Sequence, residues 1–360
     1  MKENTKHKKN SGKQPTISDI AKIAGVSTAA VSYVINEKKG VSDEVREHIR
    51  AVMARAGYSQ NLRAKGLKTR RSYAIHAVIR KEAAPACKSF YFGVIACMAE
   101  RLSAGNYSIV PVFQSDDEDD TTLSGLMRNG DTDGLIAFQG LTPRTARTIE
   151  EIDLPCVVIN PGFEANPGAV SVKIDFEALS YRATAYLASL GHKDIAFIGM
   201  RSLPFFFSAT KRGFLRAMRE NALPVRKDWI RGEAACSEGA AEAMGNILSE
   251  SVVAQCGHPT AVFCAQDNFA ISAMSAARAA GYLVPEDIGF VGLDDVPEAK
   301  YIEPPLATIP ISPQILADEA LDRLFALIDG TPAKSVTIPS MDVIPRASVL
   351  RTAAHGACSA

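Results

Sequence analysis

The sequence lacks the features that would assign it to a membrane, an export pathway or a disulfide-bonded scaffold. No uninterrupted apolar run reaches membrane-spanning length. The basic N-terminal stretch MKENTKHKKNSGKQ is not followed by the apolar segment of a secretory signal, so we expect a cytoplasmic protein with no membrane contact. The seven cysteines are an odd number and include no C-x-x-C pair, which favours buried reduced thiols over a zinc site or disulfides.

Common enzyme signatures are also missing. The chain has no G-x-S-x-G, Walker A, H-E-x-x-H or G-x-G-x-x-G motif, so we predict that it is not an enzyme and carries no cofactor or catalytic metal. The acidic stretch SDDEDD at 115–120 has no defined cage of ligands, so we interpret it as a solvated turn, with a metal site as the alternative. His192 follows Gly191 at an expected helix end, where we predict a structural role.

The balanced net charge hides a division of the chain. Lys and Arg together number 40, as do Asp and Glu, but residues 1–71 hold 16 basic and 6 acidic side chains, whereas residues 72–360 hold 24 and 34. A small basic segment on a larger acidic body suggests that the segment meets a polyanion. For residues 1–15 we retain the simpler interpretation of a disordered, solvated tail.

Three short helices are expected between residues 16 and 60. The stretch TISDIAKIA predicts the first helix, with Ser18 as its N-cap and Asp19 in its first turn. Its buried side is expected to hold Ile20, Ile23 and Ala24. Gly25 then permits a left-handed turn at no steric cost.

A second and a third helix follow this turn. In GVSTAAVSYVIN, Ser27 is the expected N-cap of the second helix. In VSDEVREHIRAVMARAGY, Ser42 is the expected N-cap of the third, and Gly57 ends it. The apolar stripes of the two helices comprise Val31, Val34 and Ile35, and Val45, Ile49, Val52 and Ala56. Helix, glycine turn and helix together predict a helix-turn-helix unit.

The polar side of the second helix has chemistry that suits DNA. In such units this helix enters the major groove and its N-terminal residues reach the base edges. Thr28, Ser32 and Tyr33 can hydrogen-bond to bases or phosphates, and the small Ala29 allows close approach or contact with a thymine methyl. The alternative is a three-helix bundle without a DNA role, against which the basic charge of this segment argues.

The segment YSQNLRAKGLKTRRS, residues 58–72, leaves two interpretations open. Asn61 can cap a short helix that carries Leu62, Ala64 and Leu67. Such a helix has no core partner of its own, so it would fold only when docked on DNA. The alternative is a flexible basic linker.

The remaining chain alternates strand-like and helix-like segments, which predicts parallel sheets with helices on both faces. We expect two series of strands and therefore two lobes with a cleft between them. The first series is YAIHAVI, SIVPVF, DGLIAF and PCVVIN, and the second is AVSVKID, IAFIG, AVFCAQ and IGFVGLD. Ligands bind such sheets at the carboxyl ends of the strands. The last expected helix has Ser312 as N-cap, Pro313 at its first position and Gly330 at its end.

These patterns together resemble the LacI/GalR family of bacterial transcription regulators. The likeness rests on TISDIAKIAGVSTAAVSYVIN, VSDEVREHIRAVMARAGY and N-x-x-A-x-x-L, and continues through GHKDIAFIG, FCAQDNFAI and VPEDIGFVGLDD. It implies an α + α/β fold, with a helix-turn-helix head at 16–60, a hinge helix or linker at 61–72 and a two-lobed body at 73–360 that is like a periplasmic sugar-binding protein and serves effector binding and dimerisation. The partners implied are an inverted-repeat operator in double-stranded DNA, a small-molecule effector and a second copy of the chain, with a higher oligomer left open.

The resemblance also implies roles for individual residues at the DNA. It places Thr28, Ala29 and Tyr33 in base readout, and Thr16, Ser27, Ser32 and Asn36 at phosphates. The helix from Asn61 would enter the minor groove, with Ala64 beside Leu67 and Leu67 wedged into a central base step. Two departures from the family loosen this helix: Gln60 stands where the family usually has proline, and Gly66 lies inside the helix.

At the cleft, the resemblance implies effector contacts for a set of body residues. These are Tyr91, Phe92, Asn160, Phe206, Thr210 and Asp267. Thr210 stands where many relatives have an arginine, and Ala234 where some have a stacking aromatic, so an anionic ligand is disfavoured. The aromatic run Phe205–Phe207 favours an apolar or ring-shaped ligand, although it can equally line the interlobe core. For Asp267, the alternative and compatible role is N-cap of the helix that begins near Asn268.

We therefore predict a transcription repressor whose operator affinity is controlled by a sugar or nucleobase-like metabolite bound between two lobes. One alternative is a solute-binding or sugar-processing protein that uses only the cleft. A second is an architectural regulator that binds no small molecule. Whether the effector releases or promotes DNA binding is left open.

Overall fold

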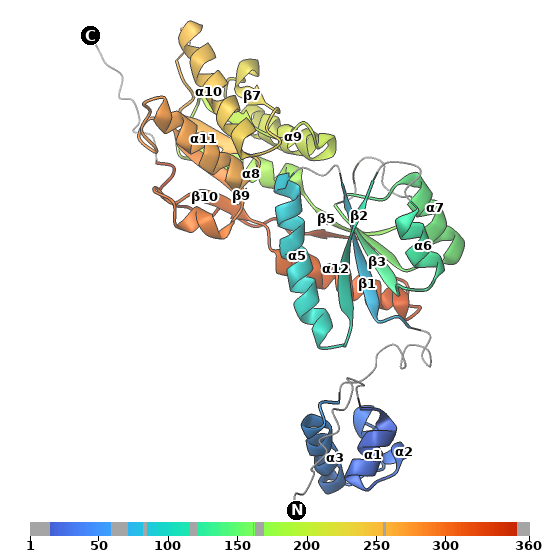
Figure 1. The fold of residues 1–360 in the computed structure, drawn as a ribbon. Coiled ribbons are helices and arrows are strands. Elements are labelled where there is room, and N and C mark those ends of the chain that lie inside the picture. Colours follow the sequence, from blue (N-terminus) through green and yellow to red (C-terminus); the bar gives the residue numbers. More distant parts are fainter. Residues whose placement is uncertain are drawn as a thin grey trace, which may run out of the picture. The chain divides into compact units, whose positions relative to one another are not determined.

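The computed structural model describes residues 15–58, 71–81, 85–115, 121–160, 162, 169–254 and 257–350. The chain separates into two compact units, residues 1–71 and residues 72–360. We refer to the first as the head and to the second as the body, and each is described by itself (Figure 1).

Within residues 15–58 the head forms three helices around one small core. They are α1 (Ile17–Ala24), α2 (Thr28–Ile35) and α3 (Asp43–Arg55). The buried apolar side chains of the head are Ile20, Ala21, Ala24, Val31, Val34, Ile49 and Val52. The prediction for Ile23 was wrong: its side chain is 63% exposed, because the buried stripe of α1 runs through Ala21 instead.

The helix ends follow local hydrogen-bond chemistry. Ser27 accepts a hydrogen bond from Ala30 N at 3.1 Å, and Ser42 accepts one from Val45 N at 3.5 Å, which confirms both as N-caps. The N-cap of α1 is Thr16 and not Ser18, which corrects the sequence prediction. Thr16 Oγ1 accepts from Asp19 N at 3.3 Å, while the Asp19 carboxylate accepts from Thr16 N at 2.9 Å, so the pair forms a capping box.

The described body contains two parallel sheets, each with helices on its faces (Figure 1). The N-lobe sheet has the strand order β11-β5-β4-β3-β1-β2. Its strands are β1 (Ala74–Arg80), β2 (Ser108–Gln114), β3 (Gly134–Phe138), β4 (Cys156–Ile159), β5 (Val170–Ile174) and β11 (Val336–Ile338). The helices of this lobe are α5 (Pro85–Ser103), α6 (Thr122–Arg128), α7 (Pro143–Ile152) and α12 (Pro313–Ile328).

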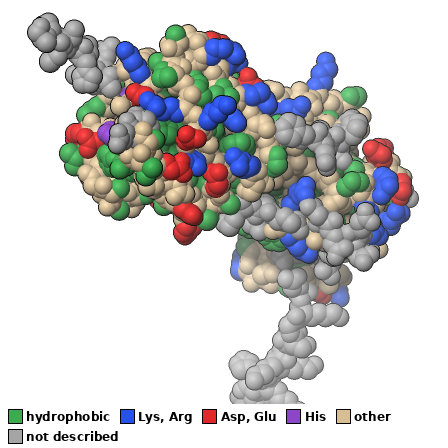
Figure 2. Space-filling model, turned by 90° about the horizontal axis from the view of Figure 1, so that it is seen from above, with side chains coloured by type: hydrophobic (Ala, Val, Ile, Leu, Met, Phe, Trp, Pro, Cys, Tyr) green, Lys and Arg blue, Asp and Glu red, His purple; other side chains and the backbone are tan. Residues whose placement is uncertain are grey.

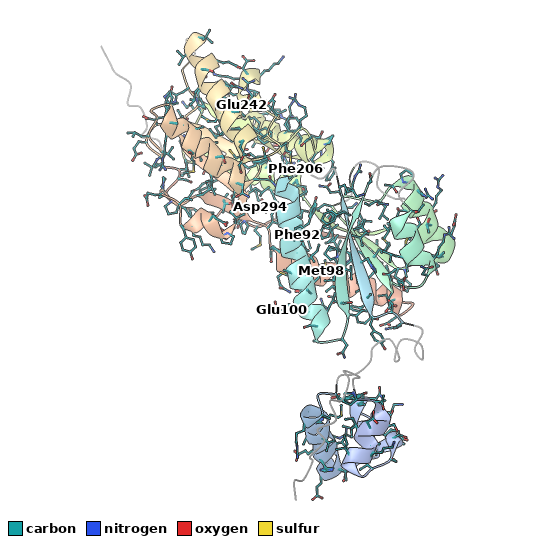
Figure 3. The ribbon with its side chains drawn as sticks, viewed as in Figure 1. Phe92, Met98, Glu100, Phe206, Glu242 and Asp294 are labelled. Atoms are coloured by element: carbon teal, nitrogen blue, oxygen red, sulfur yellow. The ribbon has the colours of Figure 1, made fainter. Side chains whose placement is uncertain are left out.

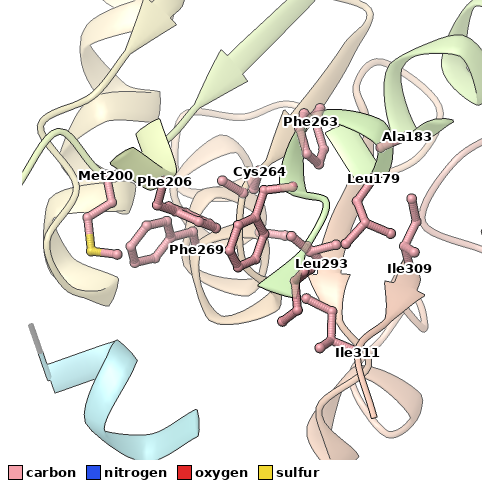
Figure 4. Close-up of a cluster of buried hydrophobic side chains, with 14 of the residues drawn as sticks. Leu179, Ala183, Met200, Phe206, Phe263, Cys264, Phe269, Leu293, Ile309 and Ile311 are labelled. Atoms are coloured by element: carbon pink, nitrogen blue, oxygen red, sulfur yellow. The ribbon is translucent and has the colours of Figure 1, made fainter. Parts of the chain in front are cut away.

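The C-lobe sheet has the strand order β10-β9-β8-β6-β7. Its strands are β6 (Ile195–Ile198), β7 (Ile230–Arg231), β8 (Ala261–Cys264), β9 (Gly289–Asp294) and β10 (Ala307–Pro310). Its helices are α8 (Phe176–Ser189), α9 (Pro204–Glu220), α10 (Ser237–Val253) and α11 (Asp267–Ala279), with short 3-10 turns at Lys227–Trp229 and Pro297–Lys300. Ring contacts inside this lobe join Phe197 to Phe214 and to Phe263, with centroids 5.4 and 5.6 Å apart. Figure 4 shows Phe206, Phe263 and Phe269 in the same cluster of buried side chains.

One strand lies in the other lobe from the one predicted. The segment AVSVKID supplies β5, which pairs with β4 in the N-lobe sheet and not with the C-lobe strands. The described chain passes between the lobes three times: after β5, between β10 and α12, and between β11 and the bridge that joins Ile344 to Thr308. Each lobe is therefore built from separate parts of the sequence.

Ion pairs on the body surface are mostly exposed. Glu177 on α8 bonds Arg212 at 2.8 Å and Arg216 at 3.3 Å, both on α9. Figure 2 shows basic and acidic side chains intermixed on the visible face of the molecule. Because exposed pairs of this kind contribute about 0 to 1 kcal/mol each, the buried cores carry most of the stability.

Candidate DNA-binding face and interlobe pocket

Six of the seven described residues predicted to contact DNA lie on α2 or cap its ends, and the seventh, Thr16, caps α1. Those that the structure describes are exposed, except Ser32, which is half-buried. The described members of the set are Thr16, Ser27, Thr28, Ala29, Ser32, Tyr33 and Asn36. Asn61, Ala64 and Leu67 lie outside the described residues, as do Gln60 and Gly66.

The N-terminal end of α2 is suited to an anion. The helix TAAVSYVI carries no acidic side chain in its first turn, so its dipole is not compensated by a carboxylate of its own. Exposed backbone N–H groups at such an end point outward and can bind a phosphate. Together with the basic charge of residues 1–71, this end of α2 favours the backbone of a nucleic acid.

The Tyr33 ring packs against the turn that follows α2. A side chain at Gly40 would come within 3.1 Å of the ring, and Gly40 has φ +121°, which L-residues rarely adopt. The turn is closed further by Lys38 N, which donates to Tyr33 O at 2.9 Å, and by Arg46, which donates to Lys38 O at 2.9 Å. At the end of the helix, Asn36 Nδ2 donates to Ser32 O at 2.7 Å. The position of the Tyr33 side chain on the exposed face of α2 therefore depends on the turn that contains Lys38 and Gly40.

In the body, one pocket is lined by both lobes. Its walls come from the start of α5, from the loops after β3, β4, β6, β8 and β10, from the C-terminal end of β9 and from the first turns of α8 and α9. The described lining residues are Phe90, Tyr91, Gln139, Asn160, Gly162, Phe176, Met200, Leu203, Phe205, Phe206, Gln266, Asp294 and Ile311. Figure 3 labels Phe206 and Asp294 from the C-lobe side of this region. The pocket thus lies at the carboxyl ends of the strands, as the sequence predicted.

Three of the predicted effector residues line this pocket. The Tyr91 ring stacks on Phe138 with centroids 4.5 Å apart. Asn160 Oδ1 accepts a hydrogen bond from Ile174 N at 2.8 Å. Phe206 meets Phe176 edge to face at 4.8 Å.

The structure does not bring Phe92, Thr210 or Asp267 into the pocket. Phe92 is 44% exposed and faces Phe113, because one residue along α5 turns it away from the direction of Tyr91. Thr210 is fully buried within the C-lobe, and its Oγ1 donates to Phe206 O at 2.8 Å. Ala234 is also fully buried.

Asp267 is buried and fully engaged inside the C-lobe. It begins α11, whose N-cap is Gln266, so the predicted N-cap role was wrong. Its carboxylate accepts from Thr308 Oγ1 at 2.5 Å and from Val296 N at 2.9 Å. Burial raises the pKa of Asp267 to about 6, against the opposing effect of these hydrogen bonds. Asp267 therefore holds the backbone after β9 against β10.

Sequence reasoning missed Gln266 and Asp294, which occupy the ends of neighbouring strands. β8 pairs with β9 up to Phe263 and Val291, Gln266 comes two residues after β8, Asp294 ends β9, and both side chains line the pocket. Gln266 Oε1 is buried and has no hydrogen-bond partner among the described residues. Burial, and then the charge of Asp267, raise the pKa of Asp294 well above its usual range. The sequence signal for these two residues is their position at the carboxyl ends of buried strands: Gln266 comes two residues after β8, and Asp294 is the last residue of β9.

His192 is buried and linked to the end of the described chain. Its Nδ1 lies 3.1 Å from Thr260 Oγ1 and its Nε2 lies 3.0 Å from Leu350 O. Burial lowers the pKa of His192. These contacts support the predicted structural role.

The described residues hold no helix long and apolar enough to cross a membrane. They also contain no group of three or more His, Cys, Asp or Glu side chains that could hold a metal ion. Of the acidic stretch 115–120, residues 116–120 lie outside the described residues.

Comparison with known proteins connects both units to one family. Residues 16–61 match the bacterial regulatory proteins of the lacI family, and residues 184–349 match the periplasmic binding protein-like domain. The HTH-type transcriptional repressor PurR of Glaesserella parasuis serovar 5 (strain SH0165) is 30% identical over 337 residues, which are 92% of this chain and 96% of that protein. The repressor PurR of Histophilus somni (strain 129Pt) is 31% identical over 317 residues, 87% of this chain and 92% of that protein.

Solved structures agree with this match. The lac repressor dimer bound to operator and the anti-inducer ONPF is 26% identical, with a TM-score of 0.74, and the alignment covers 94% of this chain and 100% of that one. The two-lobed α/β body and the helix-turn-helix head are therefore a shared fold. The chain belongs to the LacI family of bacterial regulatory proteins, as a DNA-binding transcriptional repressor and not an enzyme.

Proposed function

We propose that this repressor binds an inverted-repeat operator as a homodimer or higher oligomer, and that a small molecule in the interlobe pocket changes its operator affinity. The observation that carries the proposal is that both lobes line one pocket. A ligand held there contacts both lobes at once, so its affinity depends on how they are arranged. The solved lac repressor, a dimer bound to operator and to an anti-inducer, supports the same arrangement of partners here.

At the DNA, α2 occupies the major groove. Thr28, Ala29 and Tyr33 read base edges, and the phosphate contacts come from Thr16, Ser27, Ser32 and Asn36. The exposure of these side chains and the uncompensated N-terminal end of α2 support this assignment. Tyr33 offers one hydroxyl, so it specifies fewer groups than a bidentate side chain would.

The proposal assigns a separate function to each part of the chain. Residues 16–60 bind DNA, residues 61–72 connect the units and residues 73–360 bind effector and dimerise. In the connecting segment, we propose that Asn61, Ala64 and Leu67, which lie outside the described residues, contact the minor groove of the operator. The separation of the chain into compact units at residue 71 supports a connection at this point.

The effector is a ring-bearing metabolite of the sugar or nucleobase-like kind. Tyr91 and Phe206 supply aromatic faces, and Asn160 supplies an amide to the same pocket. Rings stack on such faces, and polar ring substituents bond to amides.

Selection of bound sequences from a random duplex pool tests the operator assignment. We expect an enriched palindrome, and an affinity for it that falls steeply as salt rises, because basic side chains release counterions from the phosphates. Absence of any enriched motif would refute the proposal. Repeating the selection with candidate sugars and nucleobases tests whether a ligand changes operator affinity.

Deletion of residues 1–72 separates this proposal from a protein that works through its cleft alone. The truncated body should retain ligand binding and lose operator binding. An unchanged activity after deletion would favour a solute-binding or sugar-processing protein. A full-length chain that binds operator but no small molecule would favour an architectural regulator.

A further inference from the structure

The interlobe pocket holds one acidic side chain that no cation in its described lining balances. Among its thirteen described lining residues, Asp294 is the one charged side chain. No hydrogen bond or ion pair to the Asp294 carboxylate is present within the described parts of the chain. Burial without a partner disfavours the charged form of Asp294, and a positive group from the ligand would restore that form by pairing with it.

The next residue along the chain, Asp295, differs from Asp294 because its carboxylate has cationic partners. Asp295, the next residue, pairs with Arg346 at 2.5 Å and lies 3.8 Å from Lys300 Nζ. Both cations therefore pair with Asp295 and not with Asp294. Asp294 lies at the pocket with φ +120°, a strained conformation for an aspartate. The chain holds the unpaired acid, and not the paired one, against the cavity.

A second acceptor lines the same pocket as Asp294. Gln266 is more than nine-tenths buried, lines the same pocket, and its Oε1 has no hydrogen-bond partner among the described residues. Two acceptors on adjacent strand ends match a group with several N–H donors. An anionic or acceptor-only group would leave both unsatisfied.

Aromatic rings complete the surroundings of these acceptors. Phe90, Tyr91 and Phe206 line the same pocket. The faces of such rings attract cations and also stack on flat ligand rings. The described lining therefore combines ring surfaces, neutral amides and one unpaired carboxylate.

We infer that the effector is a ring compound bearing a protonated nitrogen, an amine or amidine, which binds between Asp294 and Gln266 while its ring lies on the pocket aromatics. This rests on the proposed function of the pocket and narrows the ligand class. The nitrogen supplies the charge that Asp294 lacks and donors for both acceptors. A carboxylate or phosphate on the same ring meets no cation among the described lining residues.

The test uses full-length protein and matched compounds. Each set has one ring scaffold bearing an aminomethyl, a hydroxymethyl or a carboxylate group, beginning with benzylamine, benzyl alcohol and benzoate and extending to sugar-ring and purine-ring sets. Dissociation constants are measured by calorimetry. We expect the amine of at least one set to bind at least 10-fold more tightly than its alcohol, and the carboxylate not to bind.

Three variants locate the effect. Asp294→Asn removes the acid that can ionise to pair with an amine, and should abolish the preference for the amine. Glu298→Gln, an exposed acid that lines a neighbouring cleft, is the matched control and should retain it. Phe205→Ala should weaken every pocket ligand regardless of charge.

The outcomes separate this inference from the function on which it rests. If alcohols or carboxylates bind best and Phe205→Ala weakens them, the effector pocket stands and the amine class is refuted. A preference for amines that survives Asp294→Asn also refutes it. If no compound of any class binds while operator is still bound, the effector pocket and the amine class fail together.

Discussion

At the level of single residues, the Tyr33 ring can hold its orientation because position 40 is a glycine and leaves room for it. An alanine at this position would have to hold φ +121° and would place its Cβ within 3.2 Å of two ring carbons of Tyr33. We therefore expect Gly40→Ala to shift the ring and to weaken or change the preference at the base pair that Tyr33 reads, by about 10-fold for a lost contact worth ~1.4 kcal/mol. Duplex selection with the variant measures the preference directly.

The control for Gly40→Ala is Gly57→Ala in the same head. Gly57 also has a positive φ, +62°, but a Cβ there meets nothing within 4 Å. This variant should lose some stability through backbone strain and keep the wild-type base preference. Equal preferences in wild type and Gly40→Ala would show that the glycine does not position Tyr33.

The capping of α1 gives a second prediction at this scale. Thr16→Ala removes the acceptor of Asp19 N and one half of the capping box, so it should destabilise the head by about 1 kcal/mol. Ser18→Ala, two residues on and inside the helix, should be nearly neutral. Hydrogen exchange of the α1 amides distinguishes them: faster exchange in Ser18→Ala than in Thr16→Ala would contradict the assignment.

The choice between Thr16 and Ser18 as N-cap of α1 shows which features can be predicted from local sequence and which cannot. Ser42 was predictable as a cap because it is the nearest hydroxyl before its apolar stripe, and Ser27 because it is the first hydroxyl after the Gly25 turn. Before α1, Thr16 and Ser18 both offer a hydroxyl, and only the partner at Asp19 selects the first of them. At the pocket, Asp267 and Asp294 both end strand-like segments, and burial against Thr308 removes Asp267 from the cavity.

At the scale of elements, α8 and α9 approach through a glycine. A Cβ at Gly213 would lie 2.1 Å from Glu177 O and 2.9 Å from Tyr181 N, which are backbone atoms of α8. Since backbone cannot move aside as a side chain does, Gly213→Ala should force the helices apart and cost about 3 kcal/mol or more. Urea unfolding of the full-length chain measures the loss.

Gly245 in α10 provides the opposite case. A Cβ there meets nothing within 4 Å, so Gly245→Ala should stabilise the helix by about 0.5 to 1 kcal/mol. The two variants make the same chemical change in two helices of one lobe, α9 and α10. If both stabilise the protein, the close contact of α8 and α9 does not exist in solution.

The strands illustrate a limit of pattern reading at this scale. The four strands of each expected series were predictable from their apolar runs. The expectation that SIVPVF is buried was wrong, because β2 lies at the edge of its sheet and is mostly exposed. The sequence of β5 carries no mark of the lobe that it joins. Its place is set by pairing with β4 and with β11, which lies more than 160 residues away in the sequence. Periodicity describes a strand, whereas sheet membership depends on contacts between distant segments.

At the scale of the whole molecule, the three crossings of the chain make the pocket a joint property of the lobes. Ile311, between β10 and α12, lines the pocket at one crossing, and Phe176 lines it just after another. A ligand at these points contacts the segments about which the lobes would turn. We therefore propose that the segments which cross between the lobes transmit the effect of ligand binding to operator affinity.

Reciprocity gives the last prediction. If a ligand changes operator affinity by some factor, operator DNA must change ligand affinity by the same factor, since both describe one coupling free energy. Calorimetry of the tightest ligand from the matched panel, with and without saturating operator, should return the factor measured by operator titration. The chain lacking residues 1–72 is the control, and its ligand affinity should not respond to operator. Unequal factors would mean that the ligand acts on DNA binding from a site other than the interlobe pocket or through a change in oligomeric state.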